Sequence, residues 1–208
     1  MDSPANSVTT AVTKKIMRFF VLDRSGSMDT IADDTIGGYN SFVRDQKEFG
    51  GTMSLIQFDD LINTVYENVE IENVQPLTKD TYIPRGSTAL YDAIGYAIKM
   101  VEEQTEIHKD AEFTIVILTD GFDNASRNYN SMHIKDLVRI YTRLGWDFMF
   151  LGASSESILA ARNIGMDETQ TMQFNPREVA SAFRCLSSTM SQQAQGRVAT
   201  LCDTARMA

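Results

Sequence analysis

Short apolar runs alternate with amphipathic stretches along this chain, and each apolar run ends at a turn residue. This alternation limits the folds that the chain can adopt. Two of these runs, residues 17–22 and 113–119, are almost continuously apolar or β-branched and end at Asp23 and Asp120. Runs of this length and composition are typical of strands buried on both faces. Further strands are expected at residues 53–58, 62–69, 147–151 and 169–174.

Helical periodicity separates the expected strands. Apolar residues recur at helical spacing in residues 31–49, 134–144 and 155–164, and most cleanly in residues 89–103. A last helix is expected to begin at Pro176, with Asn175 as its cap, and to run toward Met190. Strands that alternate with helices predict an α/β fold of the doubly wound, Rossmann-like type.

The expected sheet has six strands, mostly parallel, with helices on both faces. One antiparallel edge strand is expected, because only a short turn at Asp59 and Asp60 separates residues 53–58 from residues 62–69. Along the chain we expect a disordered lead-in at 1–14, a main domain at 15–175, and a C-terminal helix with a polar tail at 176–208.

Charge and hydropathy argue against several classes of function. The net charge of −9 argues against general affinity for nucleic acid or for anionic membranes. The first fifteen residues are polar and lack the apolar core of a secretory signal, and no apolar run reaches about 18 residues. The sequence therefore predicts a cytoplasmic protein without a membrane span.

One group of residues carries recognisable chemistry. After the first strand the chain reads Asp23-Arg24-Ser25-Gly26-Ser27, which directs a carboxylate and two hydroxyl groups toward one point. Thr88, on a turn before a helix, and Asp120, at the end of a later strand, are expected at the same edge of the sheet. Hard oxygen ligands suit Mg²⁺, Mn²⁺ or Ca²⁺, and water or a carboxylate from outside would complete the coordination.

These three segments resemble a known family. An Asp-x-Ser-x-Ser motif, a Gly-Ser-Thr turn ending at Thr88 and a Thr-Asp-Gly at Asp120 are similar to the metal-ion-dependent adhesion site of von Willebrand factor type A (vWA) domains. The resemblance spans residues 16–174 and is nearest to small, stand-alone prokaryotic and phage members. It implies a divalent cation bound by Asp23, Ser25, Ser27, Thr88 and Asp120, with both serines direct and Asp23 or Asp120 partly through water.

The function that the resemblance implies is protein binding. The cation, Mg²⁺ or else Mn²⁺ or Ca²⁺, would hold an Asp or Glu of a partner protein. An AAA+ ATPase or a multi-protein assembly is the kind of partner that similar proteins suggest. No general base or nucleophile constellation is visible in the sequence, so we do not expect an enzyme.

Other interpretations of the motif remain open. Asp23 to Ser27 is also compatible with an ordinary strand-to-helix turn that a serine caps. A phosphatase of the haloacid dehalogenase type needs a second acid where this chain has Ser25, and no phosphate-binding loop is present. A Mg²⁺-dependent phosphoryl or hydrolytic enzyme and a nucleic-acid-associated vWA protein are the two alternative functions.

Three arginines adjoin the expected site in sequence, namely Arg24, Arg85 and Arg127. They either neutralise nearby acids or form a positive rim that steers an acidic ligand to the metal. The segment 120–127 is expected to form one wall of the site. Within that wall, Asp123 and Asn124 belong to the expected rim, and Asn124 either holds water or caps the next turn.

Overall fold

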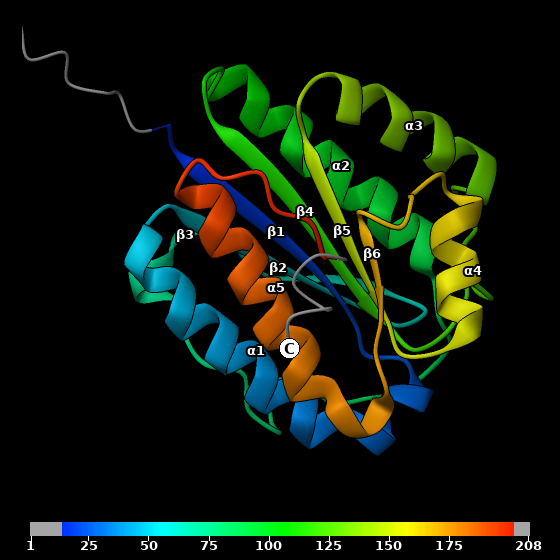
Figure 1. The fold of residues 1–208 in the computed structure, drawn as a ribbon. Helices are drawn as coiled ribbons and strands as arrows, with labels where there is room; N and C mark the ends of the chain where they lie inside the picture. The colour runs from blue at the N-terminus through cyan, green and yellow to red at the C-terminus, as the bar shows by residue number, and fades with distance from the viewer. Residues whose placement is uncertain (1–13, 202–208) are drawn as a thin grey trace, which may run out of the picture.

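The computed structural model describes residues 14–201, which form a six-stranded sheet covered by helices on both faces (Figure 1). The strand order is β3-β2-β1-β4-β5-β6, and all neighbours are parallel except β2 and β3. This confirms the predicted doubly wound sheet with one antiparallel edge strand. The strands are β1 (Ile16–Asp23), β2 (Thr52–Phe58), β3 (Ile62–Glu70), β4 (Glu112–Thr119), β5 (Asp147–Gly152) and β6 (Thr171–Gln173).

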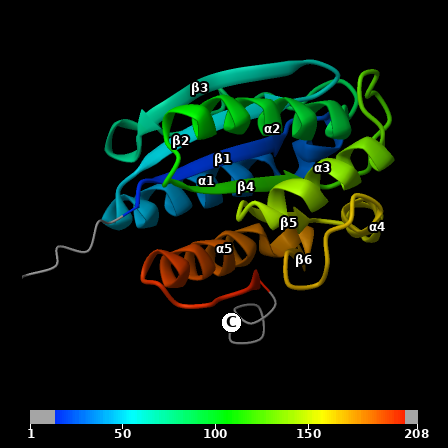
Figure 2. The ribbon, with the colours of Figure 1, turned by 90° about the horizontal axis from the view of Figure 1, so that it is seen from above.

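The helices form two layers. Helices α1 and α5 cover one face of the sheet, and α2, α3 and α4 cover the other (Figures 1 and 2). Short 3-10 turns adjoin several of these elements, and one of them, Gly26–Ile31, follows β1 directly. The helices are α1 (Ala32–Gln46), α2 (Leu90–Ile107), α3 (Ser131–Arg143), α4 (Ser155–Asn163) and α5 (Val179–Ala194).

The C-terminal part differs in detail from the sequence-based prediction. Strand β6 has three residues, shorter than the expected 169–174, because only residues 171–173 pair with β5. Helix α5 runs to Ala194, past the expected end near Met190, so the first residues of the expected polar tail are helical. The lead-in at 1–13 and the tail residues 202–208 lie outside the described residues.

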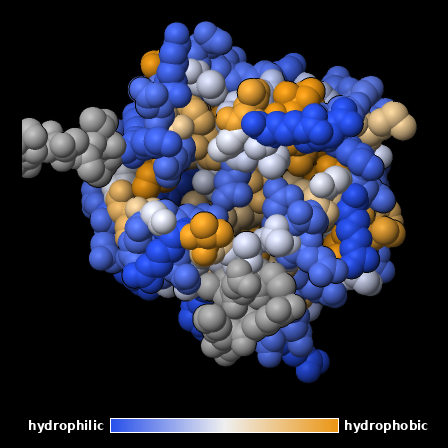
Figure 3. Space-filling view, turned by 45° about the horizontal axis from the view of Figure 1, so that its top comes forward, coloured by the Kyte–Doolittle hydropathy of each residue, from blue (hydrophilic) through white to orange (hydrophobic). Residues whose placement is uncertain are grey.

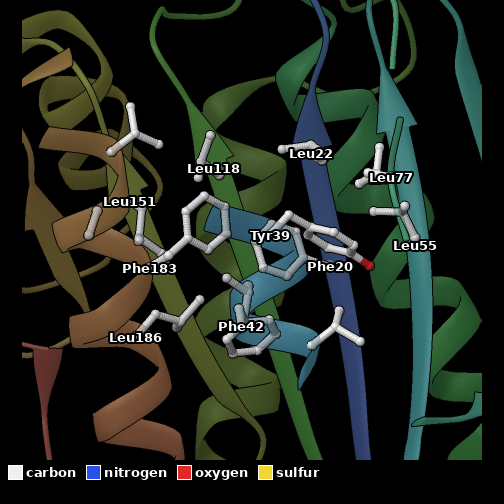
Figure 4. Close-up of a cluster of buried hydrophobic side chains, with 14 of the residues drawn as sticks. Phe20, Leu22, Tyr39, Phe42, Leu55, Leu77, Leu118, Leu151, Phe183 and Leu186 are labelled. Carbon is white, nitrogen blue, oxygen red and sulfur yellow. The ribbon is translucent and has the colours of Figure 1, made fainter. Parts of the chain in front are cut away.

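The period of two along the strands builds two hydrophobic cores. On β1, Phe20 and Leu22 point toward α1 and α5, whereas Phe19 and Val21 point toward α2. The first core is drawn in Figure 4, where side chains of β1, α1 and α5 meet. Phe183 of α5 stacks on Phe20 with ring centroids 6.0 Å apart, so the last helix is an integral part of this core.

Helices α1 and α5 approach each other closely at a glycine. A Cβ atom on Gly38 would lie 2.2 Å from Cδ2 of Phe183, whereas a Cβ atom on the neighbouring Gly37 would meet nothing within 4 Å. The two glycines share a helix but have opposite surroundings. Only Gly38 is required for the contact between the helices.

The antiparallel edge of the sheet is irregular. Its pairing with β2 shifts register twice, between Met53 and Leu55 and between Leu55 and Ile56. Beside this irregularity Asn68 has a positive φ of 49°, and its backbone N–H donates to Ser54 Oγ at 2.9 Å. Within residues 14–201 no helix is both long and apolar enough to cross a membrane.

The sheet reverses its winding direction between β1 and β4. The chain moves from β1 outward to β2 and β3 in one direction, and from β4 outward to β5 and β6 in the other. Because β1 and β4 are parallel neighbours, their carboxyl ends lie side by side, one strand spacing of about 4.8 Å apart. Ligands bind in the crevice at such a switch point, and Asp23 and Asp120 stand there.

Candidate metal centre

Asp23 is the most buried polar group of the centre. It ends β1, has an exposed fraction of 0%, and accepts hydrogen bonds from the Ser25 N–H and the Thr119 hydroxyl, each at 2.6 Å. The Tyr82 hydroxyl donates to the Asp23 carbonyl at 2.6 Å. These contacts fix both the backbone and the carboxylate. Burial, with a smaller contribution from the nearby charge of Asp120, raises the pKa of Asp23 to about 6.

A line of oxygen atoms leads from the first loop to Asp120. The Ser27 hydroxyl donates to Asp120 Oδ1 at 2.7 Å, and Ser25 Oγ lies 3.2 Å from Ser27 Oγ. On the far side, the Ser154 hydroxyl donates to the Asp120 carbonyl at 2.6 Å and so supports the loop after β4. The structure therefore brings together four of the five expected ligands, those from β1 and β4, through direct or shared contacts.

The loop that carries Thr88 is joined to the first loop by backbone hydrogen bonds. The Arg85 N–H donates to the Arg24 carbonyl at 2.8 Å, and the Gly26 N–H donates to the Gly86 carbonyl at 3.1 Å. Gly86 has a φ of +66°, and a Cβ atom there would lie 2.1 Å from Asp60 Oδ1, so glycine is required. These bonds place Thr88 beside the first loop, as the sequence predicts.

The hydroxyl of Thr88 is available for a ligand. Its backbone N–H donates to Asn124 Oδ1 at 2.8 Å, and its carbonyl accepts from Asn124 and Ala125. Thr88 is buried, yet its hydroxyl makes no hydrogen bond to any described residue. A hydroxyl without a hydrogen-bond partner among the described residues can be satisfied by an added ion or by water.

The wall formed by segment 120–127 caps helix α2. Asn124 accepts from Thr88, Asp123 accepts from the Tyr91 N–H at 3.3 Å, and Ser126 accepts from the Asp92 N–H at 2.9 Å. These amides lie at the start of α2, where the N–H groups have no partner within the helix. Asp123 and Asn124 therefore act as caps of α2.

Asp92, in the first turn of α2, also binds the end of the wall and the residues that follow it. Its carboxylate accepts hydrogen bonds from the backbone N–H groups of Arg127, Asn128 and Tyr129 at 2.8–2.9 Å. Burial opposes the ionisation of Asp92, but these hydrogen bonds outweigh it and hold the pKa of Asp92 below its usual value. The result is a rigid connection between the first turn of α2 and the wall of the site.

Two of the three expected rim arginines are paired with a buried acid. Asp59 Oδ2 accepts from Arg85 Nε at 2.9 Å and lies 3.0 Å from Arg24 Nε. Burial opposes the ionisation of Asp59, but the two guanidinium groups and the Leu61 N–H hold its pKa below the usual value. Arg127 is exposed and makes no ion pair with any described residue. Asp59, not an acid of the centre, is therefore the partner of Arg24 and Arg85.

The donor set fits a hard divalent cation. Neither Asp23 nor Asp120 makes an ion pair with a described residue, and burial raises the pKa of both carboxyl groups. The two carboxylates lie near three hydroxyl groups, and no cationic side chain of the described residues balances their negative charge. The described residues hold no group of three His, Cys, Asp or Glu side chains that suits a metal. The centre thus mixes carboxylates with hydroxyls, which suits Mg²⁺, Mn²⁺ or Ca²⁺.

Several residues that hold the candidate ligands and the wall in place were not identified from the sequence. Thr119 and Tyr82 hold Asp23, Asp59 holds the two arginines, and Asp92 holds the wall. Thr119 had a local signal, since it directly precedes Asp120 in the motif. The other contacts join residues more than 25 positions apart, and no local pattern marks them.

Comparison with protein sequences gives a distant relative. No family model matches the chain. An uncharacterized protein of Synechocystis sp. is 25% identical over 173 residues, which cover 82% of this chain and 40% of that protein. The chain thus spans about two fifths of the length of the curated relative that it matches.

Comparison with solved structures shows the fold. The von Willebrand factor domain of the type V pili tip protein Mfa5 from Porphyromonas gingivalis matches with a TM-score of 0.64 and 11% identity, covering 89% of this chain and 98% of that one. A von Willebrand factor type A protein from Catenulispora acidiphila matches with a TM-score of 0.59 and 17% identity, covering 85% and 42%. Manganese-loaded TRAP protein of Plasmodium vivax matches with a TM-score of 0.52 and 13% identity, covering 81% and 72%. The chain has a vWA-like fold.

Proposed function

We propose that this chain is a metal-dependent protein-binding module. A divalent cation at the carboxyl ends of β1 and β4 would hold an Asp or Glu side chain of a partner protein. The observation that carries the proposal is the pair of carboxylates, Asp23 and Asp120, which converge with hydroxyl groups and have no cationic partner in the described chain. A bound cation supplies the missing charge and presents an open coordination position to the partner.

Each ligand has a distinct position in this proposal. Ser25, Ser27 and Thr88 would bind through their hydroxyls. The Oγ atoms of Ser25 and Ser27 already lie 3.2 Å apart, and the Thr88 hydroxyl has no hydrogen-bond partner among the described residues. Asp120, which already contacts Ser27, and the more deeply buried Asp23 would bind directly or through water. Mg²⁺ is the preferred ion, since it retains waters and accepts ligation by few protein carboxylates.

The surface around the centre favours an acidic partner with an apolar neighbour. Arg127 is exposed and unpaired among the described residues, so it is free to contact a carboxylate. Arg24 is 12% exposed and bound to Asp59, so it contributes to the loop rather than to a rim. Phe122 in the same wall is 55% exposed and offers apolar contact area. An Asp or Glu flanked by an apolar side chain is the partner feature that fits.

The comparisons support this proposal at the level of the fold. A chain with the same fold, TRAP of Plasmodium vivax, is described as manganese-loaded, and another is the tip protein of a pilus. Because this chain spans only part of several relatives, the partner itself is inferred from the geometry of the site. A multi-protein assembly or an AAA+ ATPase is the class of partner we propose to test first.

The decisive experiment separates metal binding from partner binding. Wild type, Asp23→Ala and a matched control, Asp29→Ala, are titrated with Mg²⁺ and Mn²⁺ by calorimetry. They are then used to capture proteins from a lysate in Mg²⁺ and in EDTA. Asp29 is an exposed acid in the 3-10 turn after β1, and its side chain makes no hydrogen bond or ion pair with a described residue. We expect the wild type and Asp29→Ala to bind the cation and to retain the same partner in Mg²⁺ only.

The opposite results would overturn the proposal in distinguishable ways. Cation binding by Asp23→Ala equal to that of wild type would mean that the centre does not bind metal. Normal cation binding with the same captured proteins in Mg²⁺ and in EDTA would mean that the metal does not govern recognition.

A further inference from the structure

A second site lies at the opposite end of the sheet. A pocket of about 380 Å³ opens between the amino ends of β1, β4 and β5 and the last turns of α5. Figure 3 views this end of the molecule, where hydrophobic and hydrophilic side chains surround a hollow surface. Arg18 lines the pocket and stands five residues before Asp23 on β1, roughly 16 Å away along the strand.

Arg18 is buried with most of its hydrogen-bonding capacity unused. Its exposed fraction is 1%, and its hydrogen bond is a donation from one terminal nitrogen to the Gly50 carbonyl at 2.8 Å. The Nε atom is buried and has no hydrogen-bond partner among residues 14–201. A guanidinium group has five N–H donors, so the others are left without an acceptor in this described part of the chain. Burial lowers the pKa of Arg18 to about 10, which reflects the same loss of solvation.

No carboxylate of the described chain neutralises Arg18. In the register of the sheet, Arg18 of β1 lies opposite Thr114 of β4, and Thr114 lies opposite Asp147 of β5. The three residues therefore form one polar row on the face under α5. Asp147 is two strands from Arg18, about 10 Å between Cα atoms. Its carboxylate accepts instead from Gln193 of α5 at 2.9 Å. Buried arginines are normally paired, because an uncompensated buried charge is strongly unfavourable.

We propose that this pocket binds a small organic carboxylate, whose anionic group pairs with Arg18. A planar carboxylate accepts two parallel hydrogen bonds from a guanidinium group, and such pairs are favoured where the charge is desolvated. The remainder of the ligand would lie against Phe113 and Trp146, two further residues that line the pocket at the amino ends of the strands. The volume is within the range of small-molecule sites.

The charges around the pocket favour a monoanion. Lys14 is paired with Glu112 at 3.8 Å, so Arg18 is the cation of the lining that makes no ion pair with a described residue, and Asp147 is the acid that makes none. A doubly charged phosphate would face Asp147 and Glu112 with one guanidinium group to compensate it. A single carboxylate matches the charge of Arg18 and leaves the hydroxyl of Thr114 as a further donor to the ligand.

The test uses benzoate as the probe, with benzamide as its neutral analogue and inorganic phosphate as the alternative anion. Trp146 is the only tryptophan in the chain and gives a single indole N–H signal in a ¹H–¹⁵N NMR spectrum. We expect benzoate to shift this signal saturably and to raise the melting temperature of the wild type. Benzamide should do neither. Arg18→Met should bind benzoate at least about tenfold more weakly, since it removes a charge-assisted hydrogen bond.

Arg18→Lys provides a second comparison. Arg18→Lys retains the charge without the planar fork, so it should bind benzoate more weakly than wild type and more tightly than Arg18→Met. If Arg18→Met does not fold, the comparison with Arg18→Lys stands in its place. Equal benzoate binding by wild type and either variant would overturn the proposal, as would no saturable shift in the wild type. Saturable binding of phosphate without binding of benzoate would also overturn it.

Discussion

Ser27 and Asp120 stand 93 residues apart in the sequence, yet the hydroxyl of one donates to the carboxylate of the other at 2.7 Å. The contact joins the loop after β1 to the loop after β4, across the switch point of the sheet. It exists because the two strands are parallel neighbours, so their carboxyl ends meet.

Mg²⁺ should stabilise the wild type but not Asp120→Asn. A ligand that binds only the folded state at 100 times its Kd adds about 2.7 kcal/mol to the free energy of unfolding. Asp120→Asn removes one of the two carboxylates, so the Mg²⁺-dependent rise in melting temperature should vanish. Scanning fluorimetry in Mg²⁺ and EDTA measures this, with Asp29→Asn as the control. A full Mg²⁺ response in Asp120→Asn would exclude Asp120 as a ligand.

Asp59→Asn should destabilise the protein far more than the same change at its neighbour. Asp59 is buried and pairs with Arg24 and Arg85, whereas Asp60 is exposed and makes no ion pair with a described residue. Removing one partner of a buried ion pair costs about 3–5 kcal/mol. Urea unfolding of Asp59→Asn and Asp60→Asn provides the measurement. Equal midpoints for the two variants would show that the ion pairs contribute nothing to stability.

Adjacent alanine substitutions in α1 should have effects of opposite sign. Gly37→Ala places a methyl group in open space on the helix, so it should stabilise the protein by about 0.5–1 kcal/mol. Gly38→Ala drives a methyl group into the ring of Phe183, so it should destabilise by about 1–3 kcal/mol. Chemical denaturation of both variants tests the contact of α1 with α5. A stabilised Gly38→Ala would mean that α5 does not pack there.

The contribution of Asp92 should depend on pH. Its pKa is lowered in the folded state, so its stabilisation is present above the unfolded pKa of about 4 and is lost as the pH falls through the folded value. Asp92→Asn should cost about 2–3 kcal/mol at pH 7, since it removes hydrogen bonds to a charged group. The difference between wild type and variant should be nearly the same at pH 7 and pH 5 and should be smaller when unfolding is measured at pH 3. A difference that stays constant with pH would exclude this ionisation as the cause.

The architecture and the edge that holds the centre were predictable from the sequence. Strands β1 and β4 are short apolar runs with a clear end, and parallel pairing forces Asp23 and Asp120 together. The short turn at Asp59 predicted the antiparallel edge strand. These features are local in the sequence, or they follow from general rules of sheet topology.

The supporting contacts were not predictable in the same way. Asp92 has the sequence environment of an ordinary residue on an amphipathic helix, and its acceptor role appears only when the wall folds against α2. In the sequence, Asp59 has the environment of an ordinary turn residue, and its ion pairs with Arg24 and Arg85 form only in the folded chain. Strand β6 was predicted too long because Phe174 packs in the core beyond the last residue of the strand, and Gln170 and Phe174 each share only one backbone hydrogen bond with β5. In each case the deciding partner lies far away along the chain.

The irregular pairing of β3 and the shortness of β6 affect how readily a strand of another chain could add to this sheet. A long, regular edge strand is a template on which a second chain can add a strand, and such addition is the first step of aggregation. Here one edge strand shifts register twice and has a positive φ at Asn68, and the other edge strand has three residues. Neither edge is a long regular strand, so addition of a strand from another copy of the chain is disfavoured.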